Sequence, residues 1–222
     1  MDTLIVGAGG HGKVVLDILR AAGRYKPLGF IDADPARAGT TVGGLPVFGA
    51  ANLLPKLRQQ HRQLKHAIVA IGDNRARPSC VPRLIEARLT LINAVHPTAT
   101  VSLSATLGRN VVVAAHAVVC AEATLGDSVI VNTGAIVEHE CEVGEAAHVA
   151  PAAALAGRVR VGRGAFVGLG ARVIPCLTVG GHAIVGAGAV CITDVPAYAT
   201  VVGVPARVIK IEQPQNLALA RA

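Results

Sequence analysis

The chain has 222 residues, enough for one or two domains, and a formal net charge of +7 at pH 7. Its Lys and Arg residues are scattered, Trp is absent, and no zinc-finger spacing or aromatic stacking motif accompanies them. This argues against a nucleic-acid-binding protein and favours ligands that carry phosphates. Hydrophobic residues make up 52% of the sequence and aromatic residues only 2%, as expected for a core of Val, Ala and Leu.

The cysteines predict a reducing compartment. An odd number of them, without a CxxC pair or a recognisable signal peptide, indicates free thiols and a cytoplasmic protein. No apolar run is long enough to cross a bilayer. The five positions are Cys80, Cys120, Cys141, Cys176 and Cys191.

Residues 1–94 predict a first domain of alternating strands and helices. Strands are expected at 3–6, 28–31, 66–71 and 90–93, and helices at 14–22, 50–60 and 75–88. Such an alternation over about ninety residues indicates a small parallel sheet of half-Rossmann type.

The segment 7–13, GAGGHGK, follows the first expected strand and allows several interpretations. Its glycines match G-x-G-x-x-G, and Asp32 lies 20 residues beyond Gly12, which taken alone suggests NAD. The same letters spell G-x-x-x-x-G-K, but Val14 stands where a P-loop needs Ser or Thr for magnesium, which excludes that motif. Half a dinucleotide fold also weakens the NAD hypothesis. A phosphate site at a helix N-terminus remains, with a purely structural tight turn as the alternative.

From Val95 to Val185 every sixth residue is Val or Leu, sixteen times in succession. Four residues after each lies a second column, Ala99 to Ala189, that is almost entirely small. A period of six fits neither a helix nor an alternating strand, but it is typical of a parallel β-helix with three hexads per coil. Glycine recurs every eighteen residues from Gly108 to Gly180, which suggests one turn per coil that needs positive φ.

The most polar interruption of the repeat is the segment 137–142, VEHECE. His139 lies two places after the interior Val137, so we expect its side chain to project outward. Histidine is suited to act as a general base, because an imidazole ordinarily titrates near neutral pH. Glu140 is the expected group to orient the imidazole, and Glu138 is the alternative. A solvated surface histidine is the structural alternative.

Gly157 lies one coil of eighteen residues beyond His139 and should stack beside it. Its amide could donate to an oxygen that becomes negative during a reaction beside His139, which is the role of an oxyanion hole.

These features together resemble one family. They are a strand followed by GAGGHGK, an Asp after the second strand, IGDN at 71–74 and the hexapeptide repeats. The likeness, over residues 1–210, is to bacterial sugar acetyltransferases related to sialic acid O-acetyltransferase, including enzymes that N-acetylate nucleotide-linked amino sugars. It implies a left-handed β-helix and a homotrimer with active sites between subunits. The family's base lies in an I/V-E-H-E segment, which this chain carries at 137–140.

In that family the N-terminal domain holds the nucleotide of the sugar substrate. The resemblance assigns this role to Gly9, Gly10, His11, Asp32, Ala33, Gly72, Asp73 and Asn74. The first three would contact the diphosphate, the next three would lie near the nucleoside, and the last two would lie beside them at the carboxyl ends of the strands.

The resemblance also assigns residues to acetyl-CoA. His148 would line its site, and Leu169 and Ala187 would meet the pantetheine arm, with simple packing as the alternative. A segment near the C-terminus, 202–207, resembles the family's G-x-P-A-K/R closure. Arg207 and Lys210 either meet the coenzyme phosphates or are solvated.

The expected organisation is a nucleotide-sugar-binding domain at 1–94, an acetyltransferase β-helix at 95–210 and a tail at 211–222 that is frayed from Gln213. We expect an acetyl-CoA-dependent N-acetyltransferase that acts on a nucleotide-linked amino sugar, such as a UDP-4-amino-4,6-dideoxy sugar, in polysaccharide or glycan biosynthesis. The amine would attack the thioester directly, without an acetyl-enzyme, because Cys141 belongs to the interior column. No metal is expected, because the histidines lack ligand spacing.

Three alternatives remain open at this point. The first keeps the fold and changes the acceptor to a hydroxyl of sialic acid or a related sugar. The second is an NAD(H)-binding sensor or oxidoreductase fused to an inert β-helix. The third is a structural module with a vestigial site.

Overall fold

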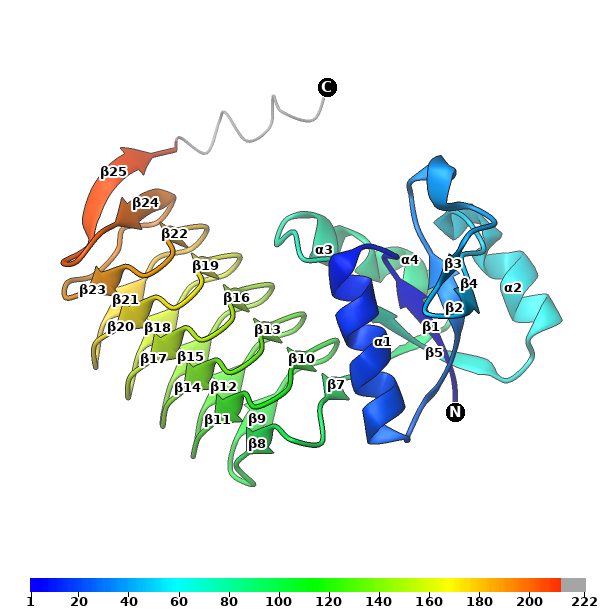
Figure 1. Ribbon diagram of the computed structural model, residues 1–222, viewed down its shortest axis with the longest axis horizontal. Coiled ribbons are helices and arrows are strands. Elements are labelled where there is room, and N and C mark those ends of the chain that lie inside the picture. The colour runs from blue at the N-terminus through cyan, green and yellow to red at the C-terminus, as the bar shows by residue number, and fades with distance from the viewer. Residues whose placement is uncertain (213–222) are drawn as a thin grey trace.

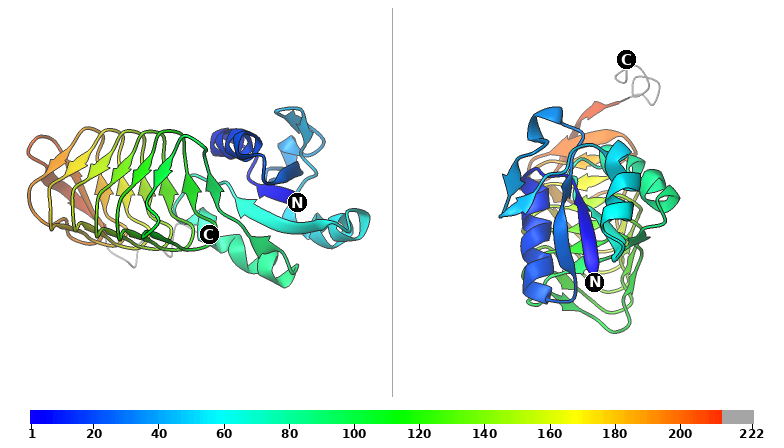
Figure 2. Two further views of the ribbon diagram at one scale, coloured as in Figure 1. Left: turned by 90° about the horizontal axis from the view of Figure 1, so that it is seen from below. Right: turned by 90° about the vertical axis from the view of Figure 1, so that its right-hand side faces the viewer.

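The computed structural model describes residues 1–212, which form an α/β domain at one end of a prism of stacked coils (Figures 1 and 2). The sheet of the α/β domain has the order β2-β1-β5-β6, and all its pairs are parallel. Its strands are β1 (Asp2–Val6), β2 (Lys26–Ile31), β5 (Leu64–Val69) and β6 (Thr90–Leu91).

Helices cover both faces of this sheet (Figure 2). On one face lies α1 (Gly10–Ala22), whose buried Val15 and Leu19 pack with Ile5 and Ile68, and with Ile130 of the prism. The other face is covered by α2 (Leu54–Gln60), α3 (Ala76–Ser79) and α4 (Val81–Glu86). Two short 3-10 helices, η1 (Pro35–Arg37) and η2 (Ala51–Leu53), lie in the connections. The half-Rossmann arrangement places the carboxyl ends of β1, β2 and β5 together.

Two details of this domain differ from the expected elements. The helix expected at 75–88 is divided into α3 and α4 at Cys80, because Pro82 at the start of α4 lacks the N–H that a continuous helix would use. A hairpin of β3 (Thr41–Val42) and β4 (Leu45–Pro46) was not predicted. Its turn residues Gly43 and Gly44 both have positive φ, and a Gly-Gly pair is a known signal for such a turn.

The prism has three faces, each a parallel sheet that we name after one of its strands. The β16 face comprises β7 (Ala94–Val95), β10 (Val112–Val113), β13 (Ile130–Val131), β16 (His148–Val149), β19 (Phe166–Val167) and β22 (Ile184–Val185). The β14 face comprises β8 (Thr100–Val101), β11 (Val118–Val119), β14 (Ile136–Val137), β17 (Ala154–Leu155), β20 (Arg172–Val173) and β23 (Val190–Cys191). The β15 face comprises β9 (Thr106–Leu107), β12 (Thr124–Leu125), β15 (Glu142–Val143), β18 (Arg160–Val161) and β21 (Thr178–Val179).

The register of the coils follows the sequence period. Val112 pairs with Ile130 and Val118 pairs with Ile136, each eighteen residues further along the chain. The Val/Leu column and the small column both point inward and form one continuous core. Three hexads therefore make one coil, as the period predicts.

The glycines that recur every eighteen residues serve a different purpose from the one expected. None of the glycines of this column, from Gly108 to Gly180, has positive φ. In each coil a residue with positive φ lies instead two places after the glycine, such as Ser128 (φ 61). A Cβ at Gly126 would lie 2.8 Å from the backbone nitrogen of Glu145 in the next coil. The prediction of positive φ was therefore wrong, because glycine is needed here for the close approach of successive coils.

The sheet of the β16 face continues beyond β22 with β24 (Ala199–Val202), which is parallel to β22. Its last strand, β25 (Arg207–Ile211), pairs antiparallel with β24 and closes the far end of the prism. Ile211, which we assigned to the tail, ends β25. The expected fraying from Gln213 concerns residues 213–222, which lie outside the described part of the chain. Within residues 1–212 no helix has the length and apolar character needed to cross a membrane.

A buried arginine joins the two parts. The side chain of Arg77 is 0% exposed. Its guanidinium donates to the carbonyl oxygens of Ser128 and Ala146 in the prism, at 2.7 Å each, and to the loop 71–74 on the other side. Burial lowers the pKa of Arg77 to about 10, which leaves it charged at neutral pH. This contact fixes the loop after β5 against the coils.

Candidate active site

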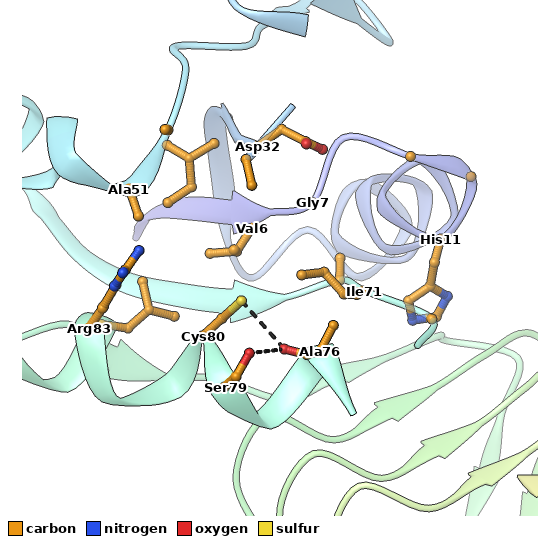
Figure 3. Close-up of a pocket in the computed structure, with 18 residues that line it drawn as sticks. Val6, Gly7, His11, Asp32, Ala51, Ile71, Ala76, Ser79, Cys80 and Arg83 are labelled. Atoms are coloured by element: carbon orange, nitrogen blue, oxygen red, sulfur yellow. Dashed lines mark hydrogen bonds between the residues drawn. The ribbon is translucent and has the colours of Figure 1, made fainter. Parts of the chain in front are cut away.

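A cavity of about 720 Å³ lies at the carboxyl ends of β1, β2 and β5, beside α3 and α4 (Figure 3). Its walls are largely apolar. Of the residues predicted to hold a nucleotide sugar, six line it: Gly9, Gly10, His11, Asp32, Ala33 and Gly72. Open α/β sheets bind ligands in this position.

The glycine loop presents the start of α1 to this cavity. Gly9 is the N-cap of α1 and offers no capping side chain, and no acidic residue lies in the first turn. The N–H groups at the start of such a helix are free to bind an anion. Gly12 packs against the carbonyl of Gly7 so closely that a side chain would not fit, which holds the turn of α1 against β1.

Asp32 and Arg37 hold the peptide groups of Ala8. One Asp32 oxygen accepts from Ala8 N at 2.7 Å and the other from Asp34 N at 2.9 Å, while Arg37 Nη1 donates to Ala8 O at 2.9 Å. Both Asp32 oxygens are thus engaged by the protein backbone. The carboxylate shapes the glycine loop, and this engagement weakens the ribose contact that the NAD hypothesis requires.

Asp73 and Asn74 lie outside the lining of this cavity and instead line a second one beside the prism. Asp73 Oδ1 accepts from the backbone nitrogens of Arg75 and Ala76 and so holds the turn that leads into α3. Asn74 Nδ2 donates to the carbonyl of Ala165 at 3.0 Å and its Oδ1 accepts from Arg77. In the described structure these two side chains position the loop.

His11 and His148 meet where the cavity approaches the prism, with ring centroids 6.5 Å apart. Burial, followed by the charge of Arg77, lowers the pKa of His11 to about 4 and that of His148 to about 3. Asn132 Nδ2 lies 3.0 Å from His148 Nε2, whereas His11 Nε2 and His148 Nδ1 are buried without a partner among residues 1–212. Both rings are neutral at pH 7 and can therefore bind a ligand as hydrogen-bonding groups rather than as cations.

His139 lies at the corner between β14 and β15, and its side chain is 52% exposed. Its Nδ1 lies 2.9 Å from Glu140 Oε2, which also accepts from Arg158 Nε at 3.1 Å. These two contacts lower the pKa of Glu140. Glu138 instead accepts from the backbone nitrogen of His139 at 3.2 Å. Of the two candidate carboxylates, Glu140 is therefore the one that contacts the ring.

Gly157 lies directly beside the His139 ring. A Cβ there would meet His139 Nε2 at 2.5 Å, so only glycine lets the imidazole take this position. The Gly157 N–H has no acceptor among residues 1–212. Because it has no internal acceptor, this N–H is available to a bound ligand as a hydrogen-bond donor, which is what an oxyanion hole requires.

The residues assigned to acetyl-CoA lie on and beside the β16 face. His148 is in β16 itself, and Leu169 and Ala187 follow β19 and β22 at the corner toward the β14 face. Leu169 is 57% exposed. Near the far end, Lys210 is paired with Glu212 at 3.0 Å, and Arg207 donates to the carbonyl of Ala206.

The structure thus brings the predicted residues together in two groups. The group around His11 and His148 lies on the β16 face. The group of His139, Glu140 and Gly157 lies at the corner opposite that face, because it lies where the other two faces meet.

Sequence reasoning missed two arginines of this region. Arg77 gave no signal, since a lone arginine in an expected helix is usually solvated, and its prism partners lie 51 and 69 residues away in the chain. Arg83, at one end of the cavity, was equally hidden in that helix. The division of 75–88 by two prolines was the one available sign that this segment bends over the sheet.

Comparisons with known proteins agree with this geometry. Residues 2–84 match the family model described as the PglD N-terminal domain. A curated relative from Bacillus subtilis (strain 168), UDP-N-acetylbacillosamine N-acetyltransferase, is 36% identical over 115 residues, and this match spans only 51% of either chain.

Solved structures match nearly the whole chain. A histidine-to-asparagine variant of perosamine N-acetyltransferase from Caulobacter crescentus, in complex with CoA and GDP-perosamine, is 46% identical, with a TM-score of 0.89 over 95% of this chain and 97% of that one. The acetyltransferase domain of PglB from Neisseria gonorrhoeae FA1090, in complex with acetyl coenzyme A, is 39% identical, with a TM-score of 0.86 over 94% and 98%. The predicted fold class, a half-Rossmann domain followed by a left-handed β-helix, is confirmed. The chain belongs to the family of nucleotide-linked amino-sugar N-acetyltransferases.

Proposed function

We propose that the protein transfers the acetyl group of acetyl-CoA to the amino group of a nucleotide-linked amino sugar. The observation that carries this proposal is the group at the prism corner, where His139 contacts Glu140 at 2.9 Å and packs against Gly157, whose N–H has no acceptor among residues 1–212. The relatives with bound CoA and GDP-perosamine, or with acetyl coenzyme A, support the two substrates. In this scheme residues 1–94 hold the nucleotide sugar, and residues 95–210 hold acetyl-CoA and the base.

The reaction follows from these groups. The neutral amine attacks the thioester carbonyl, a C–N bond forms, and His139 Nε2 accepts the proton that the nitrogen loses. Glu140 stabilises the imidazolium, and the Gly157 amide donates to the carbonyl oxygen while it is negative. Collapse breaks the C–S bond, and the imidazolium returns its proton to the departing sulfur of CoA. Cys141 is buried in the prism interior, and burial raises its pKa to about 11, so it is unsuited to accept the acetyl group.

We further propose a homotrimer whose active sites lie between neighbouring chains. His139 lies at the corner opposite the β16 face, whereas His11 and His148 lie on that face. A single chain therefore cannot bring its base to its own nucleotide cavity, but a neighbour can. Head-to-tail contacts of this kind close into a ring. Exposed apolar side chains such as Leu169 (57%) and Ile184 (40%) support an interface beside this face.

The proposed substrates also suggest where the protein acts. Nucleotide sugars and acetyl-CoA are cytoplasmic metabolites, so we place the enzyme in the cytoplasm and in glycan or polysaccharide biosynthesis. Light scattering coupled to size-exclusion chromatography tests the trimer directly, since a monomeric protein with full activity would contradict a shared site.

Acetyl transfer from acetyl-CoA to nucleotide-linked amino sugars, measured by chromatography of the products, tests the activity. We expect His139→Ala to lower kcat by about 100-fold or more, since a general base contributes a factor of that order. The hydroxy analogue of the same nucleotide sugar is the comparison substrate. Faster acetylation of the hydroxyl than of the amine would favour an O-acetyltransferase, and unchanged kcat in His139→Ala would remove the assigned base.

A further inference from the structure

We propose that Arg83 recognises the nucleobase and makes guanine the preferred base of the nucleotide sugar. This inference rests on the proposed function and extends it to a substrate class. It concerns the end of the cavity formed by η2 and α4, away from the prism.

The orientation of the substrate follows from the two ends of the cavity. In Figure 3, His11 lies at one end, next to the start of α1, and Arg83 lies at the other, with its guanidinium directed toward Ala51. The anionic diphosphate belongs at the N-terminus of α1. The sugar must continue past His11 toward the prism, because the acetyl donor binds there. The base is therefore left with the end that contains Arg83.

Few side chains at this end can donate a hydrogen bond to a base. Ser79 Oγ and Cys80 Sγ both donate to the carbonyl of Ala76. The remaining walls here are apolar, with Ala50, Ala51 and Leu84 among them. Arg83 makes no side-chain hydrogen bond and no ion pair with any residue from 1 to 212. Its guanidinium is thus the uncommitted side-chain donor that a base would meet.

The chemistry of a guanidinium favours guanine. Its parallel N–H groups match the adjacent acceptors O6 and N7 of guanine, the commonest specific contact of arginine with a base. Adenine offers a donor at N6 in place of O6 and would be disfavoured. In uracil the N3–H donor separates the acceptors O2 and O4, so uracil gains one hydrogen bond at most. Cytosine does offer an adjacent pair, N3 and O2, so CDP is the ligand that competes with GDP for a fork of this kind. The wall opposite the arginine includes Ala50 and Ala51, whose small apolar side chains offer no competing hydrogen-bonding group.

Isothermal titration calorimetry with free nucleoside diphosphates tests this. We expect the wild type to bind GDP about 10-fold or more tightly than UDP or ADP. It should bind CDP no more tightly than GDP, and tighter binding of CDP would overturn the preference for guanine. Arg83→Met keeps much of the length of the side chain and removes its donors. It should therefore weaken the binding of GDP by roughly 10- to 100-fold and change the affinity for UDP by no more than about twofold. Arg83→Lys keeps the charge without the fork and should also lose the preference. Arg62→Met, at an exposed position outside the cavity, is the matched control.

A modified ligand locates the contact. In 7-deaza-GDP the N7 acceptor is absent, so the wild type should bind it less tightly than GDP, while Arg83→Met should not distinguish the two. Equal weakening of GDP and UDP by Arg83→Met would overturn the proposal, because Arg83 would then contact the ribose or phosphate or stack on any base. Equal binding of GDP and UDP by the wild type would overturn it and leave the nucleotide site standing. Failure of every diphosphate to bind would instead contradict the proposed function.

Discussion

His148 lies in the contact between the α/β domain and the prism, and it is 8% exposed. Burial, Arg77 and His11 together lower its pKa from 6.5 to about 3. The unfolded chain therefore binds a proton at this site below about pH 6.5, and the folded chain does not. The free energy of unfolding is unaffected above that pH and decreases as the pH falls toward 3.

The magnitude follows from proton linkage. Once its unfolded form is protonated, each such histidine lowers the free energy of unfolding by about 1.4 kcal/mol for every pH unit of acidification. His148 therefore lowers the free energy of unfolding by about 2 kcal/mol between pH 6.5 and about pH 5. His11, whose pKa is lowered to about 4, adds a similar amount over the same interval. Arg77 keeps its charge throughout this range and therefore adds no slope of its own.

Urea unfolding at several pH values between about 5 and 7.5, at constant protein concentration, measures the effect. His148→Gln should reduce the loss of stability on acidification by about 2 kcal/mol relative to the wild type, whatever it does to stability at pH 7. His116→Asn, which removes an exposed imidazole at a position of positive φ, is the control. Identical pH dependence in the wild type and His148→Gln would refute the assignment of a neutral, buried His148.

Three further outcomes are expected. Gly157→Ala should lower kcat by about 100-fold, because the new Cβ displaces the His139 ring. Steady-state kinetics at saturating acetyl-CoA would measure this effect, and an unchanged kcat would contradict the contact between Gly157 and the ring. Glu140→Gln should lower kcat by about 10-fold and Glu138→Gln by less than about twofold, and equal effects would show that neither orients the ring. Arg77→Met should lower the free energy of unfolding, measured with urea, by about 3 kcal/mol or more, because several buried carbonyl oxygens lose their hydrogen-bond donor. A decrease below about 1 kcal/mol would mean that water replaces the guanidinium as the donor.

Periodicity explains why much of the prism could be predicted. Because each coil takes eighteen residues, the sequence alone places Gly157 beside His139. The same arithmetic cannot assign a purpose to the glycine column. Positive φ and close approach both call for glycine, and only the distance from Gly126 to the next coil distinguishes them.

The α/β domain was predictable in its topology but not in its side-chain contacts. Parallel strands end at one edge, which is why the glycine loop, Asp32 and Gly72 share a cavity. A residue-by-residue pattern does not say to which side of the loop after β5 each side chain points, so Asp73 and Asn74 were grouped with the cavity although they face the prism side. The hydrogen bonds of Arg77 join segments that lie far apart in the sequence, so no local sequence pattern predicts them.

The stacking of coils also restricts how this chain can change in length. Loss of one residue between 95 and 185 would move every later residue of the Val/Leu column to an outward position and bring residues that now point outward into the core. Loss of eighteen would keep all columns aligned. Deletions and insertions compatible with the core are therefore multiples of one coil. Such a change beyond residue 175 would shorten or lengthen the prism on the far side of His139 and Gly157. Evolution can thus alter the length of the prism without disturbing the corner where we propose that catalysis takes place.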